Sequence, residues 1–564
     1  MTDPNMELPD SRRIIERIDD KVIHPNEWRF VILVAVLLLV FTGLPYAYGY
    51  LTTPSDKQFM GIMLDVPDHL QYFSWMRELS EANLAANKLT PEPNKPVFFN
   101  LLWWVLGRLE KLLGWDYPIT YQFLRILATL LFLPLVYLFC AKFFLDRWKR
   151  KIAFLAICLT SGLGWILVLL KYSVTKGELL FPLDVFVAEG NTFLSILGYP
   201  HFVAAALFIF VFYLILRGEQ SNQYRFAFTA GLVALLLGWQ HAYDLISVYA
   251  ILAAYGVLKI LRDRRLPRYL IVSGVILFAI SCWPAIYSVL LTSLDPLWKE
   301  VLAQFANAGV YTPNLLHLPV LLGISFVLAL ITEIRSNPFK LKIKSDYDLF
   351  IMGWFWISFI LVYLPVDYQI HLLNGWQIPI VLLAVKGLWD WLIPAFEKRK
   401  VSLKFIQNWR FQVVIPVFFL ISISLTNVYL WTWRFIDLSR HDYPYYLYKD
   451  EVSALKWLDA NGNGSEVVLS SLDIGQYVPA LTGKHAFLAH WAQTVNFHDK
   501  VSLVEQFYSG ATSDVMRSKL LREYGIQYVF YGSAEKSLGD FQPSNVKYLQ
   551  LAFALPFAEV YRVR

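Results

Sequence analysis

The stretch Gly238-Trp239-Gln240-His241-Ala242-Tyr243-Asp244 interrupts an apolar run that extends from residue 226 to residue 260. The run is too long for one comfortable membrane-spanning helix and short for two, because a span needs about 20 apolar residues. We therefore divide it at this stretch into spans at 226–240 and 244–261. The division decides whether the number of spans is odd or even, and hence on which side of the membrane the C-terminal residues lie.

Nine further apolar runs have the length of a span. With the divided run they predict eleven spans, at 28–50, 119–145, 151–171, 199–217, 226–240, 244–261, 268–291, 315–334, 347–364, 373–394 and 411–433. Of the 564 residues, 57% are hydrophobic and 17% are charged, whereas soluble proteins contain about 25% charged residues. The predicted fold class is therefore a polytopic α-helical membrane protein, and no basic cluster with a nucleic-acid-binding signature points to a nucleic-acid partner.

The distribution of lysine and arginine supports eleven spans. With residue 1 in the cytoplasm, the predicted cytoplasmic segments hold 20 Lys and Arg in 74 residues, and the outer loops hold 8 in 129. Cytoplasmic loops normally carry this excess. Merging 226–260 into one span would move the basic segments 335–346 and 395–410 outside. The sequence thus predicts a multi-pass protein of the plasma (inner) membrane, with a cytoplasmic N-terminus and an extracytoplasmic C-terminal domain.

Three regions follow from this topology. They are a cytoplasmic N-terminal segment at 1–27, a transmembrane domain at 28–440 with a long first outer loop at 51–118, and an extracytoplasmic domain at 441–564. The loop is far longer than ordinary connections, and its segments 70–79 and 98–115 have the pattern of helices in the membrane interface. The C-terminal region alternates helix and strand signals, with strands expected at 466–470, 485–488, 526–531 and 557–563, which predicts a small α/β domain.

Histidines and carboxylates gather at the predicted outer ends of the helices. Only His24 of the ten histidines lies on the predicted cytoplasmic side. Polar residues collect in loops in any protein, but that tendency does not explain why the cytoplasmic loops are basic and almost free of histidine. Within the spans, carboxylates occur only near helix ends, at Asp244, Glu333, Asp348 and Asp390. Secondary transporters place polar groups near the midplane instead, so this pattern favours chemistry at the outer face.

The first outer loop carries Met63-Leu64-Asp65-Val66-Pro67-Asp68-His69-Leu70-Gln71-Tyr72. With the cytoplasmic N-terminal helix, the two interfacial helices and about eleven spans, this acidic motif resembles the GT-C superfamily of polytopic glycosyltransferases. The resemblance is nearest to bacterial relatives of the protein O-mannosyltransferase and aminoarabinose transferase group (glycosyltransferase family 39-like). In the C-terminal domain, the resemblance is also carried by Gly483, the run His490-Trp491-Ala492 and the run Tyr524 to Phe530.

The resemblance implies a glycosyltransferase that moves a hexosyl or pentosyl group, with inversion, from a polyprenyl-phosphate donor at the outer membrane face. The partners would be this donor, membrane lipids, and a lipid, glycan or protein acceptor. An acceptor hydroxyl must lose a proton, so one carboxylate must act as general base. By analogy with the family's first-loop aspartate, Asp68 is the candidate catalytic base and Asp65 the second choice. Asp68 could instead cap the helix that it begins.

Recognition of the donor phosphate requires a cation, and Arg125, inside the outer end of the second span, is the first candidate. Snorkelling toward the surface is its alternative explanation, and Arg77 is a weaker candidate. The other substrate-binding candidates are His69, Glu189, His201, His241, Asp244 and His371. Each of them could equally cap a helix or be a hydrogen-bonded structural residue.

We predict no metal ligands and no cofactor. The family frequently has two adjacent acidic residues, whereas here His69 follows Asp68. A divalent cation bound by Asp68, His69 and His201 or His241 is conceivable, but no ligand spacing supports it. Two other functions stay open on the sequence alone: a lipid or polymer transporter with an outer cap, and a catalytically inactive assembly protein of the same architecture.

Overall fold

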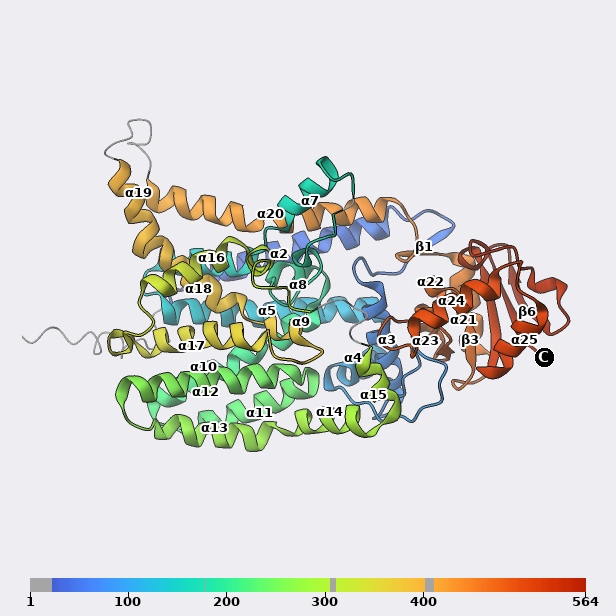
Figure 1. Ribbon diagram of the computed structural model, residues 1–564, viewed down its shortest axis with the longest axis horizontal. Coiled ribbons are helices and arrows are strands. Elements are labelled where there is room, and N and C mark those ends of the chain that lie inside the picture. Colours follow the sequence, from blue (N-terminus) through green and yellow to red (C-terminus); the bar gives the residue numbers. More distant parts are fainter. Residues whose placement is uncertain (1–22, 178, 305–310, 401–409) are drawn as a thin grey trace, which may run out of the picture. The chain divides into compact units, whose positions relative to one another are not determined.

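The computed structural model describes residues 23–177, 179–304, 311–400 and 410–564, and most of them are helical (Figure 1). The predicted cytoplasmic segment 1–27 lies almost entirely outside the described residues. The chain forms two compact units. Unit 1 comprises 1–42, 125–285 and 312–430, and unit 2 comprises 43–124, 286–311 and 431–564. The long first outer loop therefore belongs to the same compact unit as the C-terminal residues.

Among the described residues, seven helical segments are long and apolar enough to cross a membrane, and two bent helix pairs raise the number to nine. The seven are α2 (Pro25–Leu51), α5 (Tyr117–Phe143), α9 to α10 (Pro200–Ser221), α12 (Tyr243–Asp263), α16 (Leu318–Arg335), α18 to α19 (Gln377–Lys398) and α20 (Phe411–Ser439). The shorter helices α11 (Arg225–Gln240) and α17 (Asp346–Leu361) match the remaining predicted spans. Every predicted span overlaps one of these helices or pairs, and the polytopic helical fold class is confirmed.

Two predicted spans are not single helices. The span at 151–171 is α6 (Arg147–Leu159) followed by α7 (Gly164–Ser173), bent by 43°, and the span at 268–291 is α13 (Arg268–Ser281) followed by α14 (Trp283–Leu294), bent by 47°. Proline at 284 accounts for the second bend, because it removes a backbone donor and crowds the preceding turn. In the first, the backbone N–H of Gly164 donates to the Asp184 carboxylate at 2.8 Å instead of continuing the helix. Hydropathy detects neither event.

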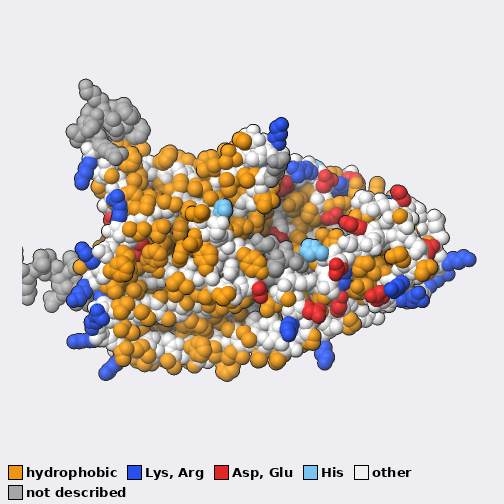
Figure 2. Space-filling view, viewed as in Figure 1, with side chains coloured by type: hydrophobic (Ala, Val, Ile, Leu, Met, Phe, Trp, Pro, Cys, Tyr) orange, Lys and Arg blue, Asp and Glu red, His pale blue; other side chains and the backbone are white. Residues whose placement is uncertain are grey.

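Unit 1 is a helical bundle in which α11 packs against α13, α12 against α17, and α16 against α18 (Figure 1). Large apolar side chains are exposed on the outside of these helices, for example Val275 and Phe418. Figure 2 shows an almost continuous hydrophobic face over this bundle, with Lys and Arg side chains gathered at one end of it. Such a surface suits lipid as the solvent, and the basic end agrees with the expected cytoplasmic side.

Two short helices of unit 1, α9 (Pro200–Ala205) and η6 (Gln369–Leu373), carry His201 and His371. The connections contain η2 (Leu183–Val185), α8 (Thr192–Gly198), η5 (Leu341–Ile343) and η6, whereas α9, η3 (Ala206–Phe208) and α10 (Ile209–Ser221) form one membrane-length segment and α18 (Gln377–Gly387), η7 (Leu388–Leu392) and α19 (Ile393–Lys400) form another. Along the chain, the helices from η2 to α9 follow α7, and η6 precedes α18.

Unit 2 combines the first outer loop with a sheet domain. The loop contains β1 (Lys57–Phe59), α3 (Val66–Glu81) and α4 (Leu101–Leu113), and α15 (Pro296–Ala303) also belongs to this unit. Asn100 begins α4 by accepting the backbone N–H groups of Leu102 and Trp103, as an N-cap does. Strand β1 pairs antiparallel with β2 (Tyr446–Tyr448), which ties the first loop to the chain that enters the C-terminal domain.

The C-terminal domain is built on a five-stranded sheet with the order β4-β3-β5-β7-β6. Its elements are α21 (Lys449–Ala460), β3 (Val467–Leu469), α22 (Leu472–Gly475), α23 (Tyr477–Thr482), β4 (His485–Ala486), α24 (Phe497–Tyr508), α25 (Asp514–Glu523), β5 (Ile526–Gly532), α26 (Ser533–Lys536), η9 (Pro543–Asn545), β6 (Leu549–Leu555) and β7 (Ala558–Val563). Strands β4, β3 and β5 are parallel, whereas β7 is antiparallel to β5 and β6. The predicted α/β domain is confirmed, with β6 as an edge strand that the sequence prediction omitted.

Candidate functional site

Helix α3 starts in a way that places Asp68 in its first turn. Asp65 occupies the N-cap position with a left-handed backbone (φ 42°), and its side chain caps no backbone group. The His69 ring instead holds the turn, with Nδ1 at 2.9 Å from the Asp65 carbonyl oxygen. Asp68 is therefore not the N-cap. A carboxylate in the first turn of a helix is stabilised by the helix dipole, so this position suits an ionised Asp68.

The Asp68 carboxylate is bonded to a histidine from the sheet domain. His490 Nε2 lies 2.7 Å from Asp68 Oδ1. The other ring nitrogen, Nδ1, accepts the backbone N–H groups of Ala492 at 3.0 Å and Gln493 at 3.3 Å. An accepting Nδ1 places the ring proton on Nε2, so His490 donates to Asp68. Protonation of Nδ1 would break two hydrogen bonds, and this arrangement keeps His490 neutral.

The loop that carries His490 is fastened to the first outer loop. The Thr494 hydroxyl accepts the backbone N–H groups of Ala489 and His490 and donates to the Leu89 carbonyl oxygen at 2.6 Å. The Asn87 amide donates to the Gln493 carbonyl oxygen at 3.0 Å. Both residues 87 and 494 are fully buried. The position of the imidazole is thus set by a buried network rather than by its own side-chain torsions.

Access differs between the two partners. The Asp68 side chain is 24% exposed, whereas the His490 side chain is 2% exposed. Asp68 Oδ2 lies 3.4 Å from the Tyr72 hydroxyl, and Tyr72 stacks on Trp103 with ring centroids 4.5 Å apart. A small molecule can therefore reach the carboxylate beside an aromatic wall, while the imidazole behind it is closed to solvent.

Arg434 of α20 is a cation near the same loop. Its Nη1 donates to the Met63 carbonyl oxygen at 3.0 Å, and its Nη2 pairs with Asp437 at 3.0 Å. Among the described residues, none offers a hydrogen-bond acceptor to the Nε–H of this buried guanidinium. Burial raises the pKa of the neighbouring Tyr445 hydroxyl, and the charge of Arg434 opposes that shift. Arg434 lies just beyond the predicted span 411–433 and was not among the sequence candidates.

In unit 1, the structure brings five of the predicted residues together. Glu189 pairs with His371 Nδ1 at 2.6 Å, and Asp244 pairs with His241 Nδ1 at 3.0 Å. The Asn374 amide donates to Asp244 at 3.2 Å. The two imidazole rings lie edge to face, with centroids 6.1 Å apart. We call Glu189, His201, His241, Asp244 and His371 the imidazole cluster.

Aromatic rings complete the imidazole cluster. Phe202 contacts the His201, His241 and His371 rings at centroid distances of 4.2, 5.8 and 5.9 Å. Tyr243 stacks on His371 at 5.4 Å. Glu189 comes from the segment before α8, His201 from α9 and His371 from η6. His241 and Asp244 both come from the stretch that interrupts the apolar run 226–260. In each His–carboxylate pair Nδ1 is bonded to the carboxylate, which makes Nε2 the acceptor nitrogen of a neutral ring, and an acceptor suits a hydroxylated ligand.

The structure places Arg125 in a different setting from the predicted one. Its guanidinium is buried, and Nη1 donates to the Thr42 hydroxyl at 2.6 Å and lies 3.4 Å from the Leu39 carbonyl oxygen. Arg125 thus joins α5 to α2 and does not snorkel. Within the described ranges, no three His, Cys, Asp or Glu side chains are grouped closely enough to hold a metal ion.

Comparisons with known proteins agree with this fold. No family model matches the sequence, and no curated protein matches it either. The structure is similar to the oligosaccharyltransferase of Archaeoglobus fulgidus in its apo form, with a TM-score of 0.54 and 13% identity over 88% of this chain and 69% of that chain. The same archaeal enzyme, AglB, in complex with an inhibitory peptide and a dolichol-phosphate gives a TM-score of 0.52.

A second similar structure is the arabinofuranosyltransferase AftD from Mycobacteria, with a TM-score of 0.56 and 14% identity over 95% of this chain and 40% of that chain. ArnT from Cupriavidus metallidurans, bound to undecaprenyl phosphate, has a TM-score of 0.46 and 11% identity over 93% of this chain and 98% of that chain. At these identities the likeness concerns the fold.

Proposed function

Because this chain has the fold of the GT-C superfamily of membrane glycosyltransferases, we propose that it transfers a sugar from a polyprenyl-phosphate donor to an acceptor hydroxyl. The observation that carries the proposal is the Asp68–His490 pair, in which a reachable carboxylate is bonded by a buried neutral imidazole. A carboxylate placed in this way can accept a proton from a bound hydroxyl.

The proposed reaction requires one base. An Asp68 oxygen takes the proton of the acceptor hydroxyl, the acceptor oxygen bonds to the anomeric carbon, and the bond from that carbon to the phosphate oxygen breaks. Attack opposite the leaving group inverts the configuration at this carbon. The departing polyprenyl phosphate is a stable anion, so no second carboxylate is needed, in contrast to glycoside hydrolysis. His490 holds the Asp68 carboxylate through Oδ1 and acts as a positioning residue.

Arg434 is the proposed partner of the donor phosphate. The hydrogen bond from its Nη1 to the Met63 carbonyl oxygen puts a guanidinium, paired with Asp437, next to the first-loop acidic motif. Guanidinium groups bind phosphates through charge-assisted hydrogen bonds. The related archaeal structure is a complex with dolichol-phosphate, which supports a lipid phosphate as the ligand class. This assignment replaces Arg125, whose guanidinium is engaged between α5 and α2.

The imidazole cluster of unit 1 is the proposed second substrate-binding region. Paired His371 and His241 present ring edges whose carboxylate partners fix their orientation, and Phe202, Tyr243 and Tyr368 add apolar faces of the kind that sugars and prenyl chains pack against. His69 is assigned the structural task of holding the Asp65 turn, because its Nδ1 is bonded to that carbonyl.

A transfer assay tests the function. The purified protein, reconstituted in lipid, is incubated with polyprenyl-phosphate sugars labelled in the sugar, together with membranes as a source of acceptor. We expect the label to leave the lipid extract and to appear in a covalent product, with free polyprenyl phosphate formed in equal amount. Boiled protein is the control. Movement of the intact labelled lipid between leaflets without covalent transfer would contradict the proposal and would favour the transporter. The absence of any reaction with every hexosyl and pentosyl donor tested would also contradict it and would favour the inactive assembly protein.

A further inference from the structure

Two broken helices of unit 1 cross in backbone contact. The break between α6 and α7 covers Thr160 to Leu163, and α16 is interrupted at Gly323, whose φ is 72°. The Leu163 N–H donates to the Val320 carbonyl oxygen at 2.7 Å, and a Cβ on Gly323 would lie 2.2 Å from the Ser161 carbonyl oxygen. Backbone groups freed by such breaks need partners inside the protein, because lipid offers none.

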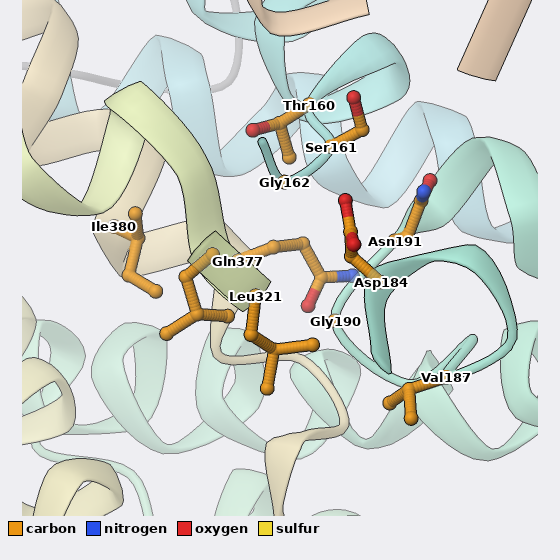
Figure 3. Close-up of a pocket in the computed structure, with 11 residues that line it drawn as sticks. Thr160, Ser161, Gly162, Asp184, Val187, Gly190, Asn191, Leu321, Gln377 and Ile380 are labelled. Carbon is orange, nitrogen blue, oxygen red and sulfur yellow. The ribbon is translucent and has the colours of Figure 1, made fainter. Parts of the chain in front are cut away.

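A cavity lies beside this crossing, and two buried polar atoms in it have no hydrogen-bond partner. Asp184, which is 2% exposed, accepts the Gly164 N–H and the Thr426 hydroxyl through Oδ2, but its Oδ1 accepts nothing. Gln377, which is 4% exposed, donates through Nε2 to the Thr192 hydroxyl at 3.2 Å, but its Oε1 accepts nothing. Both side chains line the cavity. In Figure 3 the Gln377 side chain extends toward Asp184 with its amide nitrogen on the Asp184 side and its amide oxygen turned away, and the Asp184 carboxylate points toward the break at Ser161 and Gly162.

Among the residues that the structure describes, none that lines the cavity carries a positive charge. Its other lining residues are uncharged: Thr160 and Ser161 at the break, Asn191 before α8, Leu321 and Leu322 of α16, and Ile380 of α18. From α20 the Thr426 hydroxyl reaches Asp184. The nearest carboxylate along the chain, Glu189, is paired with His371 and does not line the cavity. Burial raises the pKa of Asp184, which lies in the segment between α7 and α8, to about 7.

Two unpartnered oxygen acceptors and one unbalanced carboxylate require a positively charged or donating occupant. Leaving such atoms unpaired in a buried site is unfavourable. A water molecule would satisfy both acceptors but would leave the charge. Hard cations choose carboxylate and carbonyl oxygens, and in membrane proteins the unwound parts of broken helices hold Na⁺ or H⁺. We propose that Asp184 and Gln377 hold a monovalent cation, Na⁺ or a proton, in the cavity at the crossing of the two broken helices.

Thermal unfolding of the full chain in lipid nanodiscs distinguishes the two cations. Na⁺ is titrated against choline at constant ionic strength and pH 8, and pH is titrated separately in choline alone. If Na⁺ is the occupant, the midpoint temperature rises saturably, by about 3–10 °C, and Asp184→Asn abolishes the rise. The matched control Glu333→Gln, which removes another buried carboxylate of the same unit, retains it.

Infrared difference spectra of the wild-type protein keep the test decisive even if Asp184→Asn fails to fold. A proton is identified as the occupant if the band of a protonated carboxyl group disappears between pH 6 and pH 8 in choline. In this case Gln377→Leu should shift the frequency of that band. The same band disappearing at fixed pH on addition of Na⁺ identifies Na⁺, with Gln377→Leu requiring about tenfold more of the ion. The proposal is overturned if neither Na⁺ nor pH changes the unfolding midpoint or the band, or if a response persists in Asp184→Asn, because Asp184 is then a cap of α7 only.

Discussion

Asp68 and His490 divide their tasks according to solvent access. The reachable carboxylate carries the charge, and the buried imidazole carries one proton, on Nε2, that it directs at Oδ1. The two backbone N–H groups on Nδ1 fix that tautomer. Asp68 is therefore held by a neutral donor that, in the proposed reaction, leaves its negative charge available to the acceptor hydroxyl.

Removal of the His490 side chain should slow transfer and shift its pH dependence. We expect His490→Ala to lower kcat by up to about 100-fold with little change in the donor KM, because misplacement of a reacting group has a cost of this order. A hydrogen bond to a carboxylate favours its charged form, so the acid limb of the pH–rate profile should move to higher pH. His490→Gln, which can still donate to Asp68, should restore part of the rate. An unchanged acid limb in His490→Ala would show that the imidazole is merely structural.

The charge and shape of the Arg434 guanidinium should affect the binding of the sugar donor rather than the rate of the chemical step. We expect Arg434→Gln to raise the donor KM roughly tenfold to 100-fold, since a hydrogen bond to a charged group contributes about 1.5–3 kcal/mol, and Arg434→Lys to restore only part of it. Arg440→Gln is the matched control, because Arg440 pairs with the same Asp437 but is exposed. An equal effect of both substitutions on KM would point to Asp437 and contradict a phosphate contact of Arg434.

At the residue scale, the sequence identified one partner of the pair and not the other. Asp68 stands in a recognisable motif, whereas His490 is 422 positions away and meets it only through the Thr494 network. The imidazole cluster was foreseeable because each member stands at an outer helix end. Arg434 was missed because it follows a span directly and resembles an ordinary flanking charge. The hydrogen bond from Arg125 to the Thr42 hydroxyl of α2 could not be predicted from the sequence, and a role of Arg125 in phosphate binding stays a prediction.

At the element scale, the breaks in α6–α7 and α16 depend on glycine. Gly323→Ala should lower the free energy of unfolding by about 2–4 kcal/mol, because its left-handed backbone disfavours a side chain and the new Cβ would overlap the Ser161 carbonyl oxygen. Gly274→Ala is the control, since nothing lies within 4 Å of the added Cβ, and in a helix this change is neutral or stabilising. Equal unfolding midpoints for the two variants would contradict the close crossing.

Hydropathy predicted where the helices lie but not how they are interrupted. The eleven predicted ranges all coincide with helices or bent pairs, because apolar length is set by the thickness of the membrane. The break after Leu159 was not predicted because Thr160, Ser161 and Gly162 are small and compatible with a helix. Asp184, which accepts the N–H of the first residue of α7, is distant in sequence. Strand β6 was not predicted because its residues are mostly apolar and mostly exposed at the sheet edge, so they lack the apolar–polar alternation of a half-buried strand.

At the scale of the whole molecule, the charge asymmetry predicts which parts face the cytoplasm. The three cysteines are buried, so single introduced cysteines report on sidedness. We expect a membrane-impermeant maleimide to label Lys547→Cys in intact cells, and Arg265→Cys only after lysis, because 262–267 is one of the basic connections. Both positions are exposed. Labelling of Arg265→Cys in intact cells would reverse the orientation and remove the outer face as the place of the reaction.

The rate of sugar transfer by Asp68→Asn, measured beside Asp65→Asn, tests the central claim most directly. Both changes replace a carboxylate by an amide of the same shape, and Asn tolerates the left-handed backbone at position 65. We predict that Asp68→Asn is folded and inserted but at least about 100-fold slower, while Asp65→Asn keeps a rate near that of the wild type. A well-folded Asp68→Asn protein with undiminished transfer would contradict the assignment of Asp68 as the base.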